Sequence, residues 1–78
     1  MIKILTLKSK GGFNNLIKIA STLKSKRYET MKIIMENIGL ENFNLEITLN
    51  CDENTLNQAI RHMQKIEDVY DIKEKMEE

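Results

Sequence analysis

The sequence predicts an α+β domain in which strands and helices follow the order βαββαβ, and three observations carry this prediction. The stretch Phe43–Asn50 alternates apolar and polar side chains, which is the pattern of a strand that buries one face. Two segments, near residues 13–26 and 53–66, repeat apolar residues at helical spacing, so each buries one stripe. Short runs rich in branched apolar residues supply three further strands.

The strand over residues 2–8 is expected to lie inside the sheet. Leu5 and Leu7 point to one face, while Ile2, Ile4 and Thr6 point to the other. Apolar residues on both faces are typical of a strand with neighbours on both sides. After this strand, the sequence Ser9–Gly12 breaks the pattern and predicts a turn, because paired glycines permit positive φ.

The first helix is expected to run from Phe13 to about Lys26. Its apolar stripe consists of Leu16, Ile19, Ala20 and Leu23. Phe13 is predicted on the same buried side one turn earlier, and Asn15 on the solvent side. The basic residues Lys24, Lys26 and Arg27 suit the negative pole at the end of this helix.

The second strand is expected over residues 28–38, where Met31, Ile33 and Met35 alternate with Lys32, Ile34 and Glu36. The connection 37–42, with Gly39 as its residue of positive φ, is short enough to make an antiparallel hairpin with the strand 43–50. Phe43, Leu45, Ile47 and Leu49 form the dry face of that strand.

The second helix is expected to begin after Asp52, which is a good N-cap residue, and Glu53 adds negative charge to its first turn. Its stripe consists of Leu56, Ala59, Ile60 and Met63, extended by Ile66. A last short strand follows at residues 69–72, anchored by Val69, Tyr70 and Ile72.

These elements assemble into one known architecture. Right-handed crossovers place both helices on one face of a four-stranded antiparallel sheet, which is the ferredoxin-like βαββαβ sandwich. We expect a single domain over residues 1–78, in which the charged end 73–78 frays.

Composition excludes several classes of function. Lys and Arg number 12, as do Asp and Glu, and a zero net charge argues against nucleic-acid binding. The one cysteine, Cys51, rules out an internal disulfide and a CxxC site. The sequence contains no apolar run of membrane length, so a soluble cytoplasmic protein without membrane contact is expected.

No group of residues in the sequence predicts catalysis, a cofactor or a metal centre. His62 lies off the apolar stripe of the second helix and has no evident acidic or thiol companions, so a solvated histidine is expected. Cys51 is expected to be a small, partly buried residue rather than a reactive thiolate.

Four stretches in register carry a resemblance to a known family. They are Leu16 with Ile19, Lys26–Tyr28, Phe43–Leu49 and Met63–Val69. Over residues 5–72 the chain resembles an ACT domain, the small-molecule-sensing module of amino-acid metabolism, and it looks most like the short regulatory subunit of acetolactate synthase. The resemblance implies a non-catalytic subunit of a thiamine-diphosphate-dependent synthase in branched-chain amino acid biosynthesis, with the catalytic large subunit as partner. The alternative is a stand-alone amino-acid-sensing module that acts on another protein.

The turn after the first strand is interpreted either as a plain turn or as a ligand loop. By resemblance, an effector such as a branched-chain amino acid would bind between two protomers. It would contact Lys10, Gly11, Gly12, Phe13 and Asn14 of one chain and Glu29 or Thr30 of the other. Free N–H groups at the start of the first helix suit a carboxylate, and glycines permit its close approach.

The second strand is predicted to form a homodimer interface. It should lie at the sheet edge, where its backbone groups are unpaired, and it lacks proline and dense charge. Pairing across a two-fold axis would give a continuous sheet. The interface residues would be Thr30, Met31, Lys32, Ile33, Ile34, Met35 and Glu36.

The face of the sheet opposite the helices is predicted to dock a protein. Ile2, Ile4 and Thr6 from the first strand and Ile34 from the second are expected there. Apolar residues on an uncovered face form a patch that a partner would cover. The expected partner is the catalytic subunit of the synthase.

Overall fold

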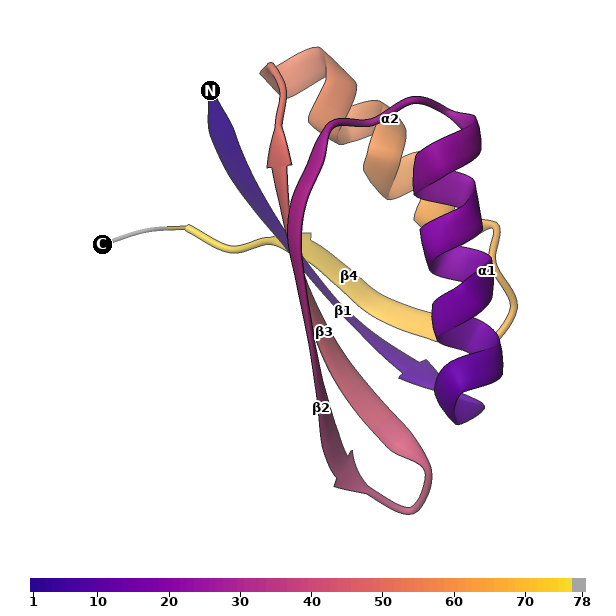
Figure 1. Ribbon diagram of the computed structural model, residues 1–78. Helices are drawn as coiled ribbons and strands as arrows, with labels where there is room; N and C mark the ends of the chain where they lie inside the picture. Colours follow the sequence, from indigo (N-terminus) through magenta and orange to yellow (C-terminus); the bar gives the residue numbers. More distant parts are fainter. Residues whose placement is uncertain (77–78) are drawn as a thin grey trace.

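The computed structural model describes residues 1–76 and has the predicted element order. The elements are β1 (Ile2–Lys10), α1 (Gly12–Ser25), β2 (Thr30–Gly39), β3 (Asn42–Asn50), α2 (Glu53–Gln64) and β4 (Val69–Glu74). Figure 1 shows both helices on one side of the sheet and no element covering the other side. The ferredoxin-like architecture is therefore confirmed.

The strands lie in the order β2-β3-β1-β4, and each neighbouring pair is antiparallel. β1 is an inner strand as predicted, and β2 and β4 are the two edges. β2 and β3 form the expected hairpin, in which Ile33 pairs with Ile47 and Met35 with Leu45. Gly39 has the predicted positive φ of 107°, but it is the last residue of β2, and the turn itself consists of Leu40 and Glu41, whose φ values of 50° and 63° are also positive.

The core lies between the helices and the sheet. The side chains predicted for the dry faces of β1 and β3 are fully or nearly fully buried, except for the half-buried Phe43, and they meet the stripes of the two helices. The buried apolar residues are Leu5, Leu7, Ile19, Leu23, Leu45, Ile47, Leu49, Leu56, Ala59 and Met63. Leu16, Phe43, Ile60 and Ile66 pack against this cluster from its margin.

The predicted inner face of α1 is partly wrong. Phe13 is 75% exposed and Ala20 is also exposed, whereas Asn15 is buried. The residues that α1 buries are Asn15, Ile19 and Leu23, which repeat at intervals of four and so form one inclined row. Phe13 and Ala20 lie on the flank of this row. That flank borders β2, where a hollow lined by Ala20, Leu23 and Ile33 remains open.

β2 begins at Thr30, two residues later than predicted, because residues 26–28 form the C-terminal cap of α1. The amide of Arg27 donates to the carbonyl of Lys24 at 3.1 Å, and the amide of Tyr28 donates to that of Leu23 at 3.0 Å. This pair of bonds is a Schellman motif. Arg27 occupies its left-handed position at φ 62°, so residues 26–28 belong to the end of the helix.

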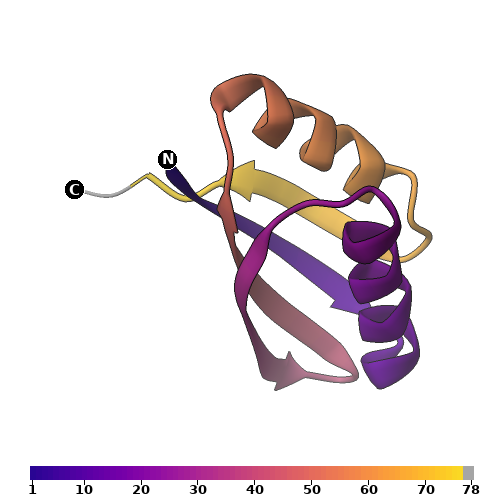
Figure 2. The same ribbon diagram turned by 45° about the horizontal axis from the view of Figure 1, so that its top comes forward.

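The start of α2 confirms the prediction. The carboxylate of Asp52 accepts a hydrogen bond from the amide of Thr55 at 2.8 Å, and Glu53 lies in the first turn. That bond holds the pKa of Asp52 below its usual value. Figure 2 shows α2 beside β4, against which it packs.

β4 is longer than predicted and irregular. It runs to Glu74, so Lys73 and Glu74 belong to a strand and not to a frayed end, and the amide of Lys75 still donates to the carbonyl of Ile4 at 2.8 Å. The last two residues of the predicted frayed end, 77–78, lie outside the described residues. The pairing of β4 with β1 shifts between Thr6 and Lys8, beside Asp71, which has a φ of 53°. These features indicate a bulge.

Candidate functional site

The Gly11–Gly12 turn exposes the start of α1 without a side-chain cap. Gly11 is the N-cap residue at φ 88°, Gly12 follows at φ 58°, and no acidic residue lies in the first turn. The first N–H groups of this helix therefore have no side chain of their own to satisfy them, in contrast to those of α2. They form the positive end of the helix dipole, which favours an anionic group.

A buried polar network holds this turn in place. The side-chain nitrogen Nδ2 of Asn15 lies 2.6 Å from Oγ of Ser9 and donates to the backbone carbonyl of Glu67 at 3.1 Å. The hydroxyl of Ser9 in turn donates to the carbonyl of Lys10 at 2.9 Å, and the amide of Lys10 donates to the carbonyl of Asp68 at 3.0 Å. The prediction that Asn15 faces solvent is therefore wrong. The feature of the sequence that indicates its burial is its position four residues before Ile19, on the same face of the helix.

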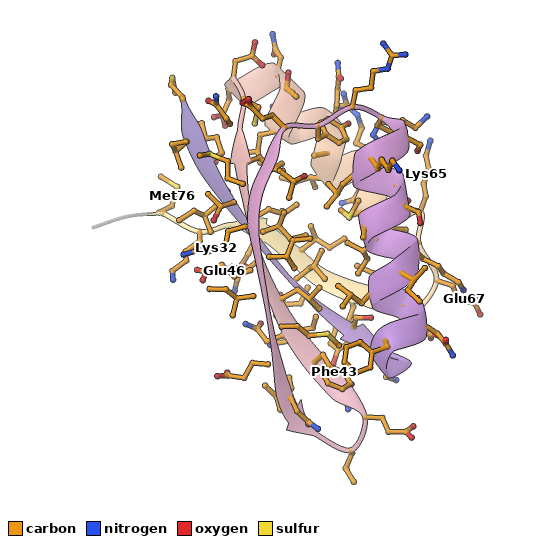
Figure 3. The ribbon with its side chains drawn as sticks, in the orientation of Figure 1. Lys32, Phe43, Glu46, Lys65, Glu67 and Met76 are labelled. Atoms are coloured by element: carbon orange, nitrogen blue, oxygen red, sulfur yellow. The ribbon has the colours of Figure 1, made fainter. Side chains whose placement is uncertain are left out.

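An open hollow of about 380 Å³ lies beside the turn. Gly11, Gly12, Asn37, Glu41 and Phe43 line it. Figure 3 shows Phe43 between the sheet and the first turn of α1, and a Cβ atom on Gly12 would lie 3.7 Å from the ring of Phe43. The hollow thus combines an apolar wall with backbone donors.

The sequence-predicted effector residues fall into two groups within one chain. Lys10, Gly11, Gly12, Phe13 and Asn14 are contiguous around the turn. Glu29 and Thr30 lie at the opposite end of the sheet, because Thr30 pairs with Leu49 whereas Lys10 pairs with Asn42. Glu29 accepts a hydrogen bond from the side chain of Asn50 at 2.7 Å. One chain alone therefore does not bring the two groups together.

The predicted interface strand lies at an edge of the sheet. Within β2, Ile33 and Met35 are half-buried toward the helices, and the remaining predicted interface residues are exposed. These exposed residues are Thr30, Met31, Lys32, Ile34 and Glu36. β2 has a neighbour on one side only, so the edge predicted for pairing is present.

The free face of the sheet is less apolar than predicted. Ile2 and Ile34 are exposed there and Ile4 is half-buried. However, β3 separates β1 from β2, and its outward residues are polar: Ile4 is level with Thr48, and Ile34 is level with Glu46. Glu46 pairs with Lys75 at 2.6 Å. Thr48 and Glu46 therefore divide the predicted apolar patch into two parts, and Figure 3 shows Glu46 on this face.

His62 is not a solvated histidine as predicted, because it is half-buried against Tyr28. The hydroxyl of Tyr28 lies 2.6 Å from Nδ1 of His62. Desolvation, reinforced by the nearby charges of Lys26, Lys65 and Arg61, lowers the pKa of His62. Desolvation also raises the pKa of Tyr28. Both groups therefore favour their neutral forms, in which they share this hydrogen bond.

Cys51 is half-buried, as predicted. Desolvation, together with the charge of Asp52, raises the pKa of its thiol, which disfavours the reactive thiolate. Over residues 1–76 we find no cluster of three His, Cys, Asp or Glu side chains placed to hold a metal ion. Neither of the two described helices is long and apolar enough to cross a membrane.

Comparison with solved structures identifies the class of fold. No protein-family model matches this sequence, and no curated protein matches it. The ACT domain from the GTP pyrophosphokinase of Chlorobium tepidum superposes with a TM-score of 0.81 at 8% sequence identity. The match covers 96% of this chain and 97% of that domain. The chain has the fold of an ACT domain.

Two longer proteins contain the same fold. The small subunit of acetolactate synthase from Thermotoga maritima matches 95% of this chain with a TM-score of 0.86 at 13% identity. This chain spans 47% of that subunit. A formyltetrahydrofolate deformylase from Pseudomonas putida also matches, with a TM-score of 0.67 at 10% identity, and this chain spans 29% of it. The fold therefore occurs both in the small subunit of a synthase and within a deformylase, and function must be argued from the site.

Proposed function

We propose that this chain is a non-catalytic regulatory subunit of a thiamine-diphosphate-dependent acetolactate synthase. The observation that carries the proposal is its superposition on the acetolactate synthase small subunit with a TM-score of 0.86. The uncapped Gly11–Gly12 turn supports it, because this turn offers backbone donors for a small acid. The subunit would modulate the catalytic subunit in branched-chain amino acid biosynthesis.

The effector site would form between two copies of the chain. A two-fold axis beside β2 runs the two β2 strands antiparallel, so the Thr30 end of one lies beside the Asn37 end of the other. Asn37 lines the hollow at the Gly11–Gly12 turn. Within one chain, Glu29 and Thr30 lie at the far end of the sheet from the turn. Dimerisation would bring Glu29 and Thr30 of the partner subunit toward the turn.

This arrangement suits an aliphatic amino acid. Its α-carboxylate would accept hydrogen bonds from the first N–H groups of α1, and its ammonium group would be held by Glu29 of the partner subunit. The half-buried ring of Phe43 would contact the side chain of the ligand. A branched-chain amino acid is therefore the proposed effector.

Asn14→Glu tests the effector site. Asn14 is exposed in the first turn of α1, so a carboxylate there should stabilise the fold by about 0.3–1 kcal/mol through the helix dipole. The same charge should repel the ligand and weaken binding about tenfold or more. Titration calorimetry with valine, leucine and isoleucine measures binding, and urea denaturation measures stability. Opposite signs in the two measurements would separate loss of the site from loss of the fold.

Ser21→Glu is the matched control, since Ser21 is exposed two turns further along α1. It should leave binding unchanged. A Gly12→Val variant is less informative because valine at φ 58° strains the backbone. If the amino acid bound Asn14→Glu as tightly as the wild type, the effector site would lie elsewhere.

Copurification tests the synthase proposal. Coexpression with an acetolactate synthase catalytic subunit from the same genome should give a stable complex, and the activity of that subunit should change when this chain is removed. Absence of both effects would contradict the proposal.

The alternative is a stand-alone amino-acid-sensing module that acts on another protein. The ACT domain from GTP pyrophosphokinase superposes on this chain with a TM-score of 0.81, so the fold is not confined to the synthase small subunit. Clear binding of an amino acid without any complex with the synthase would support this alternative.

A further inference from the structure

The charges of this chain are separated between its helical layer and the rest of the molecule. Apart from Glu53 in the first turn of α2, which pairs with Lys3, the helices and the turns that end them (residues 12–28 and 54–66) contain no Asp or Glu, yet they hold half of the 12 Lys and Arg residues of the chain. All 12 acidic residues lie at other positions. The cations of the helical layer are Lys18, Lys24, Lys26, Arg27, Arg61 and Lys65.

These six cations are exposed, and none of them forms an ion pair within residues 1–76. The lysines that do form ion pairs are Lys3, Lys8 and Lys75. Lys8 and Lys75 lie on or beside the free face of the sheet, where Asp71 and Glu46 neutralise them at 2.9 and 2.6 Å. Figure 3 shows Lys65 on the helical side and Glu46 on the opposite side. On the free sheet face two lysines are thus neutralised by ion pairs, whereas, in the described part of the chain, none of the six cations of the helical layer is.

The helical face also carries an apolar pair among its cations. Phe13 and Ile17 are 75% and 62% exposed, and they lie one turn apart on the outer side of α1, where residues four apart are neighbours. Lys18 and Lys24 flank them along the same helix. An exposed apolar anchor with a charged rim is the anatomy of a protein–protein interface. A nucleic-acid backbone would match the cations but not the apolar pair.

We propose that the outer face of the two helices docks an acidic surface of a partner protein, with Phe13 and Ile17 as the apolar anchor and the six cations as the complementary rim. The inference rests on the proposed function, under which the acidic surface belongs to the synthase catalytic subunit. It replaces the free sheet face as the docking surface, because ion pairs and the polar residues of β3 occupy that face. Charge complementarity of this kind speeds association and is weakened by salt.

Charge reversal on the two faces tests the proposal. Lys18→Glu and Arg61→Glu reverse unpaired cations on α1 and α2, and Ile17→Ser removes part of the anchor. Lys32→Glu is the matched control, since Lys32 is exposed on the free sheet face (Figure 3). Dissociation constants for the catalytic subunit would be measured by calorimetry at about 50 and 300 mM salt, after circular dichroism confirms that each variant is folded.

Each helical-face variant should weaken binding about tenfold at low salt, and the two charge reversals should also reduce its salt dependence. Lys32→Glu should change binding less than about twofold. If Lys32→Glu weakened binding as much, or if the helical variants bound like the wild type, the docking inference would be wrong while the proposed function stood. If the wild type did not bind the catalytic subunit at all, both would fall.

A duplex oligonucleotide probe tests the alternative that the helical face binds nucleic acid. The wild-type chain should not bind it at about 150 mM salt. Binding that Lys18→Glu and Arg61→Glu abolish would assign the helical face to nucleic acid and overturn the proposal.

Discussion

Tyr28 and His62 meet across 34 positions of sequence, and the surroundings of this half-buried histidine make the stability of the fold depend on pH. Desolvation of the ring and the nearby cations Lys26, Lys65 and Arg61 disfavour the imidazolium form. The pKa of His62 is lowered from its usual value of 6.5. As pH falls, the unfolded chain therefore takes up the proton first. The stabilisation is fully present above pH 6.5 and is lost below it.

We predict that the free energy of unfolding decreases as pH falls from about 6.5 to 5, where carboxylates remain ionised. His62 is the one histidine of the chain, so His62→Gln should remove this slope. Tyr28→Phe should lower stability at neutral pH by about 1 kcal/mol through the lost hydrogen bond. Urea denaturation at several pH values measures both effects. Equal slopes for wild type and His62→Gln would contradict the assignment.

Asn15 is the second residue whose effect can be predicted. Asn15→Ala removes the donor that joins Ser9 Oγ to the carbonyl of Glu67 inside the protein, and it should destabilise the fold by about 1–3 kcal/mol. Asn14→Ala makes the same change at the exposed neighbouring position, so it should stay within about 0.5 kcal/mol of the wild type. Thermal unfolding of the two variants provides the measurement. Similar melting temperatures would show that the buried network contributes little.

These residues also show where sequence reasoning fails. The apolar stripe of α1 was predicted from residue type, which placed Phe13 inside and Asn15 outside. The helix instead buries the row Asn15–Ile19–Leu23, because Asn15 finds partners on β1 and on the loop before β4. Glu67 is 52 positions from Asn15 in the sequence, and Tyr28 is 34 positions from His62. No local pattern encodes these contacts.

At the level of elements, the end of α1 contains a strained residue. Arg27 occupies the left-handed region at φ 62°, where glycine is favoured. We predict that Arg27→Gly stabilises the fold by about 0.5–1 kcal/mol in urea denaturation. Lys26→Gly, one residue earlier at φ −88°, should destabilise it. If both variants lost stability, the strain at Arg27 would be too small to matter.

Element type and order were predictable, since each element has a local cause. The alternation of Phe43–Asn50 specifies β3, and Asp52 specifies the start of α2, as its bond to Thr55 confirms. The boundaries of β1, β2 and β4 were less predictable. β1 continues through Ser9, which is buried as a partner of Asn15, and β4 continues to Glu74 because it pairs with β1. Strand pairing and polar networks of this kind depend on tertiary contacts, which a local sequence pattern does not show.

At the level of the whole molecule, the predicted dimer depends on the β2 edge. Ile34 is 44% exposed on the free sheet face of this strand. We predict that Ile34→Lys converts a dimer into a monomer, because a charge on the edge opposes strand pairing. Ile2→Lys adds the same charge to the same face on the inner strand β1 and should leave the dimer intact. Light scattering at micromolar concentration measures the mass. A wild-type mass of one chain would contradict the dimer itself.

The candidate effector site could be predicted only in part, because the resemblance supplied the turn but not its surroundings. The hollow depends on Asn37, Glu41 and Phe43, which the hairpin β2–β3 brings to the turn. Phe43 was predicted as a core residue, and it serves both roles from the margin of the core. The charge separation between helices and sheet is visible in the sequence. Only the structure shows which cations form ion pairs and which do not.

The bulge in β4 has a consequence for how large an assembly of this chain can grow. A sheet with two equally receptive edges could add chains end to end without limit, as filaments do. Here the edge opposite β2 is short, turns out of register beside Asp71, and carries the Lys8–Asp71 pair. One receptive edge and one blocked edge allow β2 to pair with β2 and allow nothing to follow. Strand pairing in this protein would therefore stop at two chains. A higher protein concentration would raise the fraction of chains in dimers and would not produce longer assemblies.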